Sequence, residues 1–175
     1  MPRRLLALPV AALILAGCAG QEAPPPAPDT TPPQVTFAAG ETSAVARPTQ
    51  YCDLRLTDCT ADPAAPVALP VPPDTPVVVT VPPEIAETPW QVVFSYRDTT
   101  GAQVDQRSPV FPPNAPGLEL APDEQSRYWT LQLPTPDSQL VTAEVQQYGP
   151  PPVANPETGE IDFPIRASWV LTATS

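Results

Sequence analysis

The stretch Trp90-Gln91-Val92-Val93-Phe94-Ser95-Tyr96-Arg97 has the two-residue period of a β-strand with one buried face. Its first, third, fifth and seventh side chains are apolar or aromatic. Gln91, Ser95 and Arg97 lie on the opposite face, and Val93 is the exception. Because successive side chains of a strand alternate between its two faces, the segment predicts a strand that packs on a core through Trp90 and the residues aligned with it.

Other short segments show similar alternation, and prolines or turn residues separate them. Proline is excluded from helix interiors and from the hydrogen-bonded middle of sheets, so the proline pairs predict strand ends. Only residues 122–126 look helical, and they predict a single turn that begins at Pro122. The predicted strands are residues 35–37, 50–52, 67–71, 77–81, 102–107, 129–133, 141–146 and 165–172.

About seven short strands with turn signals between them predict an all-β fold, an immunoglobulin-like antiparallel β-sandwich. Residues 35–37 and 50–52 precede the core strands and are expected to be extra N-terminal strands. Residues 98–101 predict a tight turn, and residues 155–159 a longer loop before the last strand. A small β-barrel is the alternative, because alternation alone does not distinguish it from a sandwich.

The N-terminus has the features of a bacterial lipoprotein leader. A basic start is followed by the apolar residues 5–15, which are too few to span a bilayer, since spanning needs roughly 20. Leu15-Ala16-Gly17-Cys18 then resembles a lipoprotein cleavage box, so Cys18 is the predicted lipidation site. The alternative is a secretory signal in which Cys18 is incidental, and Arg3-Arg4 does not decide between the Sec and Tat export routes.

Three segments follow from this interpretation. Residues 1–17 are the predicted signal peptide, residues 18–33 the lipidated cysteine with a proline-rich linker, and residues 34–175 the β-sandwich domain. The expected location is the cell membrane, with the protein lipid-anchored on the extracytoplasmic face. In that oxidising location Cys52 and Cys59 are predicted to form a structural disulfide, because their spacing matches neither a redox motif nor a zinc knuckle. The chain-entropy model gives about 2.5 kcal/mol for a loop this short.

Charge and composition exclude several classes of function. All eight basic residues are arginines, two of them in the leader, so the remaining chain has a formal net charge of 6 − 19 = −13. Such an acidic chain does not bind nucleic acid backbones. The chain has no histidine, which removes histidine-based catalysis and His-ligated zinc. No cofactor is expected.

The carboxylates are the remaining candidates for catalysis or metal binding. A glycosidase pair needs two of them fixed across a cleft, but the candidates fall in predicted turns or at strand ends. Asp53, Asp58 and Asp62 bracket the cysteines and could hold calcium, although turn hydrogen bonds are the preferred interpretation. The sequence therefore predicts no catalytic residues, no metal site and no enzyme. The other candidate carboxylates are Asp98, Asp105, Asp123, Glu124, Glu157, Glu160 and Asp162.

Several segments are similar to an actinobacterial family of secreted, single-domain, two-cysteine lipoproteins of unknown function. They are residues 48–53, Cys59, residues 81–85, residues 89–91 and residues 166–169. The resemblance implies a location in the cell envelope and supplies no catalytic residues.

These observations predict a non-catalytic binding or structural role in the cell envelope. The expected partners are the membrane, through the lipid anchor, and an envelope protein, for example by strand addition at a sheet edge. The alternative is a lipoprotein that carries or senses a small hydrophobic or sugar ligand. The sequence indicates neither the binding residues nor the oligomeric state.

Overall fold

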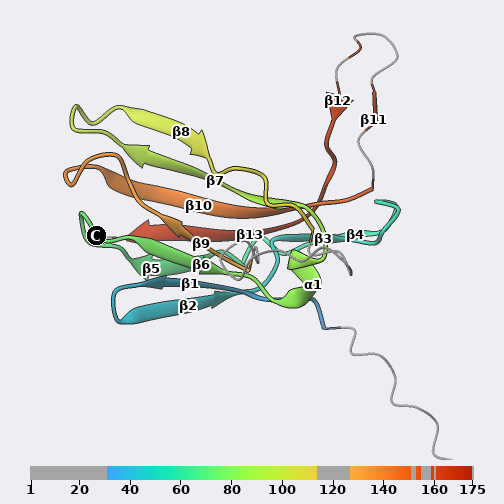
Figure 1. The fold of residues 1–175 in the computed structure, drawn as a ribbon. Coiled ribbons are helices and arrows are strands. Elements are labelled where there is room, and N and C mark those ends of the chain that lie inside the picture. Colours follow the sequence, from blue (N-terminus) through green and yellow to red (C-terminus); the bar gives the residue numbers. More distant parts are fainter. Residues whose placement is uncertain (1–30, 114–126, 151–152, 155–158, 160, 175) are drawn as a thin grey trace, which may run out of the picture. The chain divides into compact units, whose positions relative to one another are not determined.

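Two β-sheets form the layers of a sandwich around an apolar core (Figure 1). The structure is a computed structural model, and it describes residues 31–113, 127–150, 153–154, 159 and 161–174. The two sheets are not closed into a barrel, so the sandwich prediction is confirmed and the barrel alternative is wrong. No helix of the described residues is long and apolar enough to cross a membrane.

The smaller sheet has four antiparallel strands in the order β2-β1-β6-β9. Its inner face is apolar, and Phe37, Val79 and Leu131 are buried. The strands are β1 (Val35–Ala39), β2 (Thr42–Ala46), β6 (Val77–Thr80) and β9 (Tyr128–Leu131).

The larger sheet has seven strands, of which six follow the order β4-β3-β13-β10-β7-β8. The seventh, β5, lies beside the second half of β13 and runs parallel to it, next to β3 on the same edge. A two-stranded ribbon, β11 with β12, and one helical turn complete the fold. The bounds are β3 (Gln50–Cys52), β4 (Cys59–Ala61), β5 (Val67–Pro70), α1 (Pro83–Ala86), β7 (Trp90–Arg97), β8 (Gln103–Arg107), β10 (Gln139–Tyr148), β11 (Val153–Ala154), β12 (Ile161–Asp162) and β13 (Ile165–Thr174).

The strand order is that of an immunoglobulin-like sandwich. Strands β13, β10, β7 and β8 correspond to G, F, C and C′ of such a domain, and β1, β6 and β9 correspond to A, B and E. The buried Trp90 opens the strand that corresponds to C. The disulfide that joins the two sheets of antibody domains has no counterpart here, because Cys52 and Cys59 pair within the β3–β4 hairpin instead.

The predicted alternation is confirmed along β7, where Trp90, Val92, Phe94 and Tyr96 are all buried. The alternation predicted for residues 141–146 is wrong at its first residue. The register shifts at a β-bulge at Val141, so Leu140 takes the buried position and Val141 is only half-buried.

Other predictions are corrected by pairing that the local sequence does not show. The strands expected at residues 35–37 and 50–52 are present as β1 and β3, but the sequence does not show that β1 pairs with β2 on one side and β6 on the other. Strands β2 and β4 were not predicted. Residues 122–126 lie outside the described residues. The helical turn of the described part of the chain is α1, with Pro82 at its N-cap and its own residue Ile85 buried.

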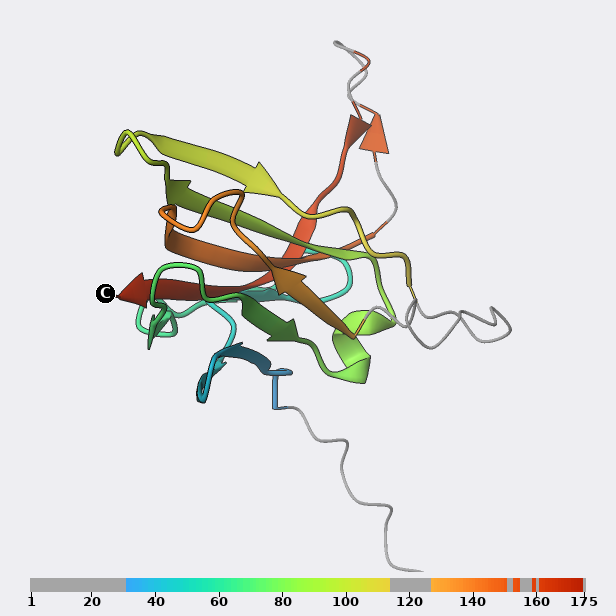
Figure 2. The same ribbon diagram turned by 60° about the vertical axis from the view of Figure 1, so that its left-hand side comes forward.

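One end of the sandwich gathers several chain segments and is called the α1 end (Figures 1 and 2). Strand β1 begins there beside the end of β6, since Thr36 pairs with Thr80. Strand β7 begins at the same end and β10 finishes there, where the N–H of Tyr148 donates to the carbonyl of Pro89 over 2.9 Å. The C-terminal end of β13 and the β7–β8 turn lie at the opposite end.

Candidate functional site

A pocket of about 720 Å³ lies at the α1 end of the larger sheet and is called the end pocket. It is formed where β7 begins, where the chain leaves β8, and where β10 ends opposite the start of β13. Its apolar lining is Pro89, Val110, Pro112, Tyr148, Gly149, Pro150, Phe163 and Pro164, and its polar lining is Gln91, Arg107 and Ser108.

Prolines lie at the strand ends that surround the end pocket. Pro89 precedes β7, and Pro150 and Pro164 lie in the connection between β10 and β13. A proline has no N–H to donate, so Pro89 and Pro164 take part only as acceptors, from the N–H groups of Tyr148 over 2.9 Å and Gly149 over 2.8 Å.

The segment after β8 forms one wall of the end pocket because it is held against the core. Trp90 and Phe111 form an isolated antiparallel bridge, with the Phe111 N–H donating to the Trp90 carbonyl over 2.8 Å. Their rings also pack, with centroids 4.3 Å apart. Because neighbouring side chains in an extended segment alternate, this places Val110 and Pro112 on the side that lines the pocket.

Tyr148 and Phe163 form an aromatic wall. Their ring centroids are 5.9 Å apart and the rings meet edge to face at 60°. Burial raises the pKa of the Tyr148 hydroxyl above its ordinary value of 10.0, while the charge of Arg107 acts in the opposite direction. The hydroxyl is therefore neutral at physiological pH and can donate a hydrogen bond.

Two large apolar side chains of the end pocket are open to solvent. Val110 is 53% exposed and Phe163 is 54% exposed, although both are of types normally found in a core. Exposed apolar residues gathered beside a concave surface are characteristic of binding sites.

Two of the three polar lining residues are used by the fold. The Ser108 hydroxyl accepts from the Val92 N–H over 2.9 Å and donates to the Pro109 carbonyl over 2.7 Å. The Gln91 amide donates to Gln146 over 3.1 Å. These bonds connect β7 to its neighbours, so they account for both side chains without a ligand.

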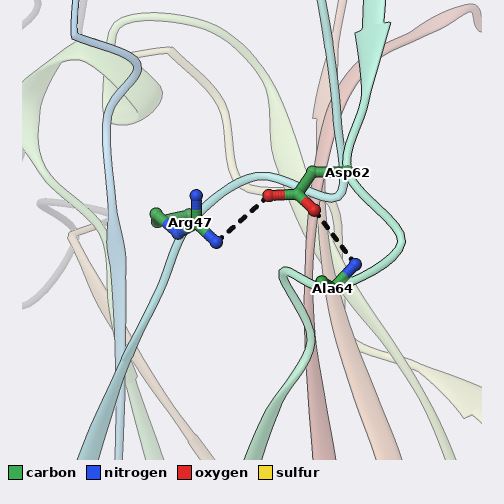
Figure 3. A network of polar contacts seen from close by, with 3 residues as sticks. All are labelled: Arg47, Asp62 and Ala64. Carbon is green, nitrogen blue, oxygen red and sulfur yellow. Dashed lines mark hydrogen bonds and ion pairs between the residues drawn. The ribbon is translucent and has the colours of Figure 1, made fainter.

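Arg107 is the exception among the polar lining residues. Within the described part of the chain its guanidinium has no ion-pair partner and no hydrogen bond. The one ion pair described is elsewhere, where Arg47 lies 3.1 Å from Asp62 (Figure 3). An unpaired cation on an apolar pocket of an acidic protein is a candidate contact for an anion.

A second, smaller hollow of about 350 Å³ lies on the outer face of β7, β8 and β10. It is more polar, and its lining includes the carboxylates of Asp105 and Glu144 as well as Arg107. Ser95 and Thr142 in its floor are hydrogen-bonded to each other at 3.1 Å. No group of three or more histidine, cysteine or acidic side chains in the described residues is placed to hold a metal ion.

The cysteines form the predicted disulfide. Cys52 and Cys59 face each other across the β3–β4 hairpin, with Cα atoms 4.0 Å apart. Within the loop, the Asp53 carboxylate accepts from the backbone N–H groups of Arg55, Thr57 and Asp58. The backbone N–H of Thr57 is the main cause of a lowered pKa of Asp53, assisted by the Thr57 hydroxyl.

Turn bonding also accounts for two further carboxylates. Asp62 accepts from the Ala64 N–H at 3.0 Å while it pairs with Arg47 (Figure 3). Asp98 accepts from the hydroxyl and N–H of Thr100 in the predicted turn, and the hydroxyl bond is the main cause of its lowered pKa. The turn hydrogen bonds expected of Asp53 and Asp62 are therefore present in the structure.

The remaining predicted residues do not form a common site in the described structure. Cys18 lies outside the described residues, as do Asp123, Glu124, Glu157 and Glu160. Tyr51 contacts Arg166. The guanidinium carbon of Arg166 lies 5.0 Å from the centroid of the Tyr51 ring, and the guanidinium donates a 3.0 Å hydrogen bond to the Tyr51 hydroxyl. Tyr128 is exposed on β9, whereas Tyr148 lines the end pocket.

The sequence interpretation missed Arg107, Val110 and Phe163. Each lies beside a proline or at a strand end, and the proline pairs were interpreted only as boundaries. Prolines at residues 89, 112, 150 and 164 mark the strand ends that line the site, but they do not indicate that these ends converge.

Comparison with known proteins gives a family but no function. The family model described as "Protein of unknown function (DUF2771)" matches residues 28–174. No curated protein and no solved structure matches the chain significantly.

Proposed function

The chain belongs to this family of unknown function, and from that premise we propose that it is a membrane-anchored lipoprotein whose extracytoplasmic domain binds a small, largely apolar ligand in the end pocket. The binding role is non-catalytic and belongs to the cell envelope. The actinobacterial, lipid-anchored character expected from the sequence is part of the proposal, with Cys18 as the acylated residue.

The end pocket is the observation that carries the proposal. Its volume of about 720 Å³ falls within the range of roughly 300–1,000 Å³ that is typical of small-molecule sites. Its walls are mainly proline, valine and aromatic side chains, and few polar groups interrupt them. An apolar ligand would cover Val110 and Phe163, which are otherwise exposed.

The lining residues also support binding rather than catalysis. Ser108 is the serine among the described lining residues, and its hydroxyl is hydrogen-bonded to the Val92 N–H and the Pro109 carbonyl. Nucleophilic catalysis needs a hydroxyl activated by a neighbouring base, and no described side chain serves Ser108 in that way.

The position of the pocket suits a tethered protein. The first described residues, 31–34, lead into β1 at the α1 end, and the end pocket lies at the same end of the domain. If Cys18 is anchored, the linker that follows it would tether this end of the domain to the membrane, from which apolar ligands can be collected.

Photo-crosslinking of the full-length protein in phosphatidylcholine nanodiscs tests the pocket. The ligand is a long-chain alcohol that carries a diazirine, and crosslinked peptides are located by mass spectrometry after peptic digestion. We expect saturable crosslinking to residues 107–112 and 148–150. Val110→Trp fills the pocket and should lower the yield about tenfold, which corresponds to about 1.4 kcal/mol.

Val45→Trp is the matched control. Val45 on β2 is 53% exposed, the same fraction as Val110, but it lies on the smaller sheet. Equal yields from the two variants, or crosslinking that does not saturate, would contradict a binding function of the end pocket. Anchoring is tested separately by incorporation of labelled palmitate, which should be lost in Cys18→Ser.

Binding of an envelope protein is a second candidate function. The loop between β3 and β4 is closed by the disulfide and braced by Asp53, yet it presents Leu54 with 71% of its surface exposed. A rigid loop with an exposed apolar tip loses little conformational freedom on binding. Crosslinking in intact cells should recover one protein that is lost in Leu54→Asp and retained in Val45→Asp.

A further inference from the structure

The geometry points to a single-chain amphiphile with an anionic headgroup as the ligand of the end pocket, with Arg107 at the headgroup and the apolar chain between Val110 and Phe163. This inference rests on the proposed function and specifies the chemistry of its ligand. The headgroup is a carboxylate or a phosphate, since both present paired oxygens to a guanidinium.

Arg107 is the first argument. It is the only charged residue among the described residues that line the end pocket, and no described carboxylate lies within ion-pair distance of it. It also lines the polar hollow on the outer face of the sheet, so it stands where the apolar pocket meets a solvated surface. That is the position a headgroup takes when its chain is buried.

Tyr148 supplies a second polar contact. Its ring is part of the aromatic wall, and its hydroxyl has no hydrogen-bond partner among the described residues. Tyr148 and Arg107 both line the end pocket. The neutral Tyr148 hydroxyl and the Arg107 guanidinium, which line the same pocket, can both donate hydrogen bonds. Together they suit an acceptor-only group such as a carboxylate.

The rest of the domain restricts the number of charges on the ligand. The chain has a formal net charge of −11, and Asp105 and Glu144 lie on the neighbouring hollow with Arg107. A ligand with several negative charges would be repelled by these groups. A headgroup with one or two charges, held by Arg107 at short range, is favoured.

The experiment compares three diazirine-bearing ligands of equal chain length: a fatty acid, an alkyl phosphate and the corresponding alcohol. Each is crosslinked to the full-length protein in phosphatidylcholine nanodiscs, and the yield is measured on residues 107–112 and 148–150. We expect the acid or the phosphate to exceed the alcohol about tenfold, and we expect this ratio to fall to about one when all three ligands are measured on Arg107→Gln.

Arg97→Gln is the matched control, because Arg97 is an exposed arginine at the other end of the β7–β8 hairpin. It should leave the preference intact. Equal yields for all three ligands, or equal effects of Arg97→Gln and Arg107→Gln, would overturn the inference and leave apolar binding in place. Failure of the alcohol to crosslink at all would instead count against the proposed function itself.

Discussion

The indole Nε1 of Trp169 donates a 2.9 Å hydrogen bond to the carbonyl oxygen of Pro33. Trp169 lies in β13 and is fully buried, whereas Pro33 belongs to the segment that leads into β1. A buried indole N–H needs an acceptor, so this bond determines where the chain enters the domain. The bond also connects the larger sheet, through β13, to the segment that leads into β1 of the smaller sheet.

Trp169→Phe should therefore destabilise the domain by about 2 kcal/mol, because it removes both this hydrogen bond and part of a buried ring. The free energy of unfolding in urea is the measurement. Trp129→Phe is the control, since Trp129 is only half-buried on β9. A loss from Trp129→Phe as large as that from Trp169→Phe would argue against the Pro33 contact.

The bulge in β10 gives a prediction about two adjacent residues. Leu140 is buried and Val141 is half-buried, so Leu140→Ala should cost about 3 kcal/mol and Val141→Ala about 1 kcal/mol or less. Unfolding midpoints in urea measure both. The reverse order would mean that the strand has the unbroken alternation expected from its sequence.

Gln147 connects β10 to α1 and can be tested by a double-mutant cycle. Its amide donates to the Thr88 hydroxyl over 2.8 Å and to the Glu84 carbonyl over 3.1 Å. Gln147→Leu and Thr88→Val should show a coupling energy of about 1 kcal/mol in unfolding experiments. Gln146→Leu, on the opposite face of β10, is the control and should show no coupling to Thr88→Val.

The Asp53 carboxylate predicts a dependence of stability on pH. Its pKa in the folded protein is lowered, mainly by the Thr57 backbone N–H, from an ordinary value of 3.8. A lowered pKa means that the stabilising contribution is complete above the unfolded pKa and is lost as the pH falls through the folded pKa. The stability difference between the wild type and Asp53→Asn should thus be constant near neutrality and shrink below about pH 4.

Thermal unfolding between pH 2 and pH 7 measures this difference. Thr57→Val removes the hydroxyl but keeps the backbone N–H, so it should show a smaller effect of the same sign. A difference that grows as the solution is acidified would show that Asp53 does not act through its charge.

The fold class was predictable because side-chain alternation is a local property. The buried row of β7 and the disulfide of Cys52 with Cys59 both follow from residues close in the sequence. Sheet membership is not local. Nothing near β1 shows that it pairs on both sides, and the parallel pairing of β5 with β13 joins segments about one hundred residues apart, as Leu171 with Val67 shows.

The end pocket illustrates the same limit. Arg107 ends β8 and Val110 follows it, whereas Phe163 precedes β13. The pairing of β8 with β7, of β7 with β10 and of β10 with β13 brings them together. Prolines predicted that strands end near these residues. Which ends converge depends on strand order, and a single sequence with this composition does not encode that in any short motif.

The position of β13 has a consequence for the order in which the protein is made. This strand is the last described segment to leave the ribosome, yet it lies between β10 on one side and β3 and β5 on the other. The larger sheet cannot be completed until residues 165–174 have been synthesised, because β13 joins β10 to β3 and β5. Before then β10 and β3 each have an open edge that can pair with other chains, so the newly made polypeptide depends on residues 165–174 for protection from aggregation.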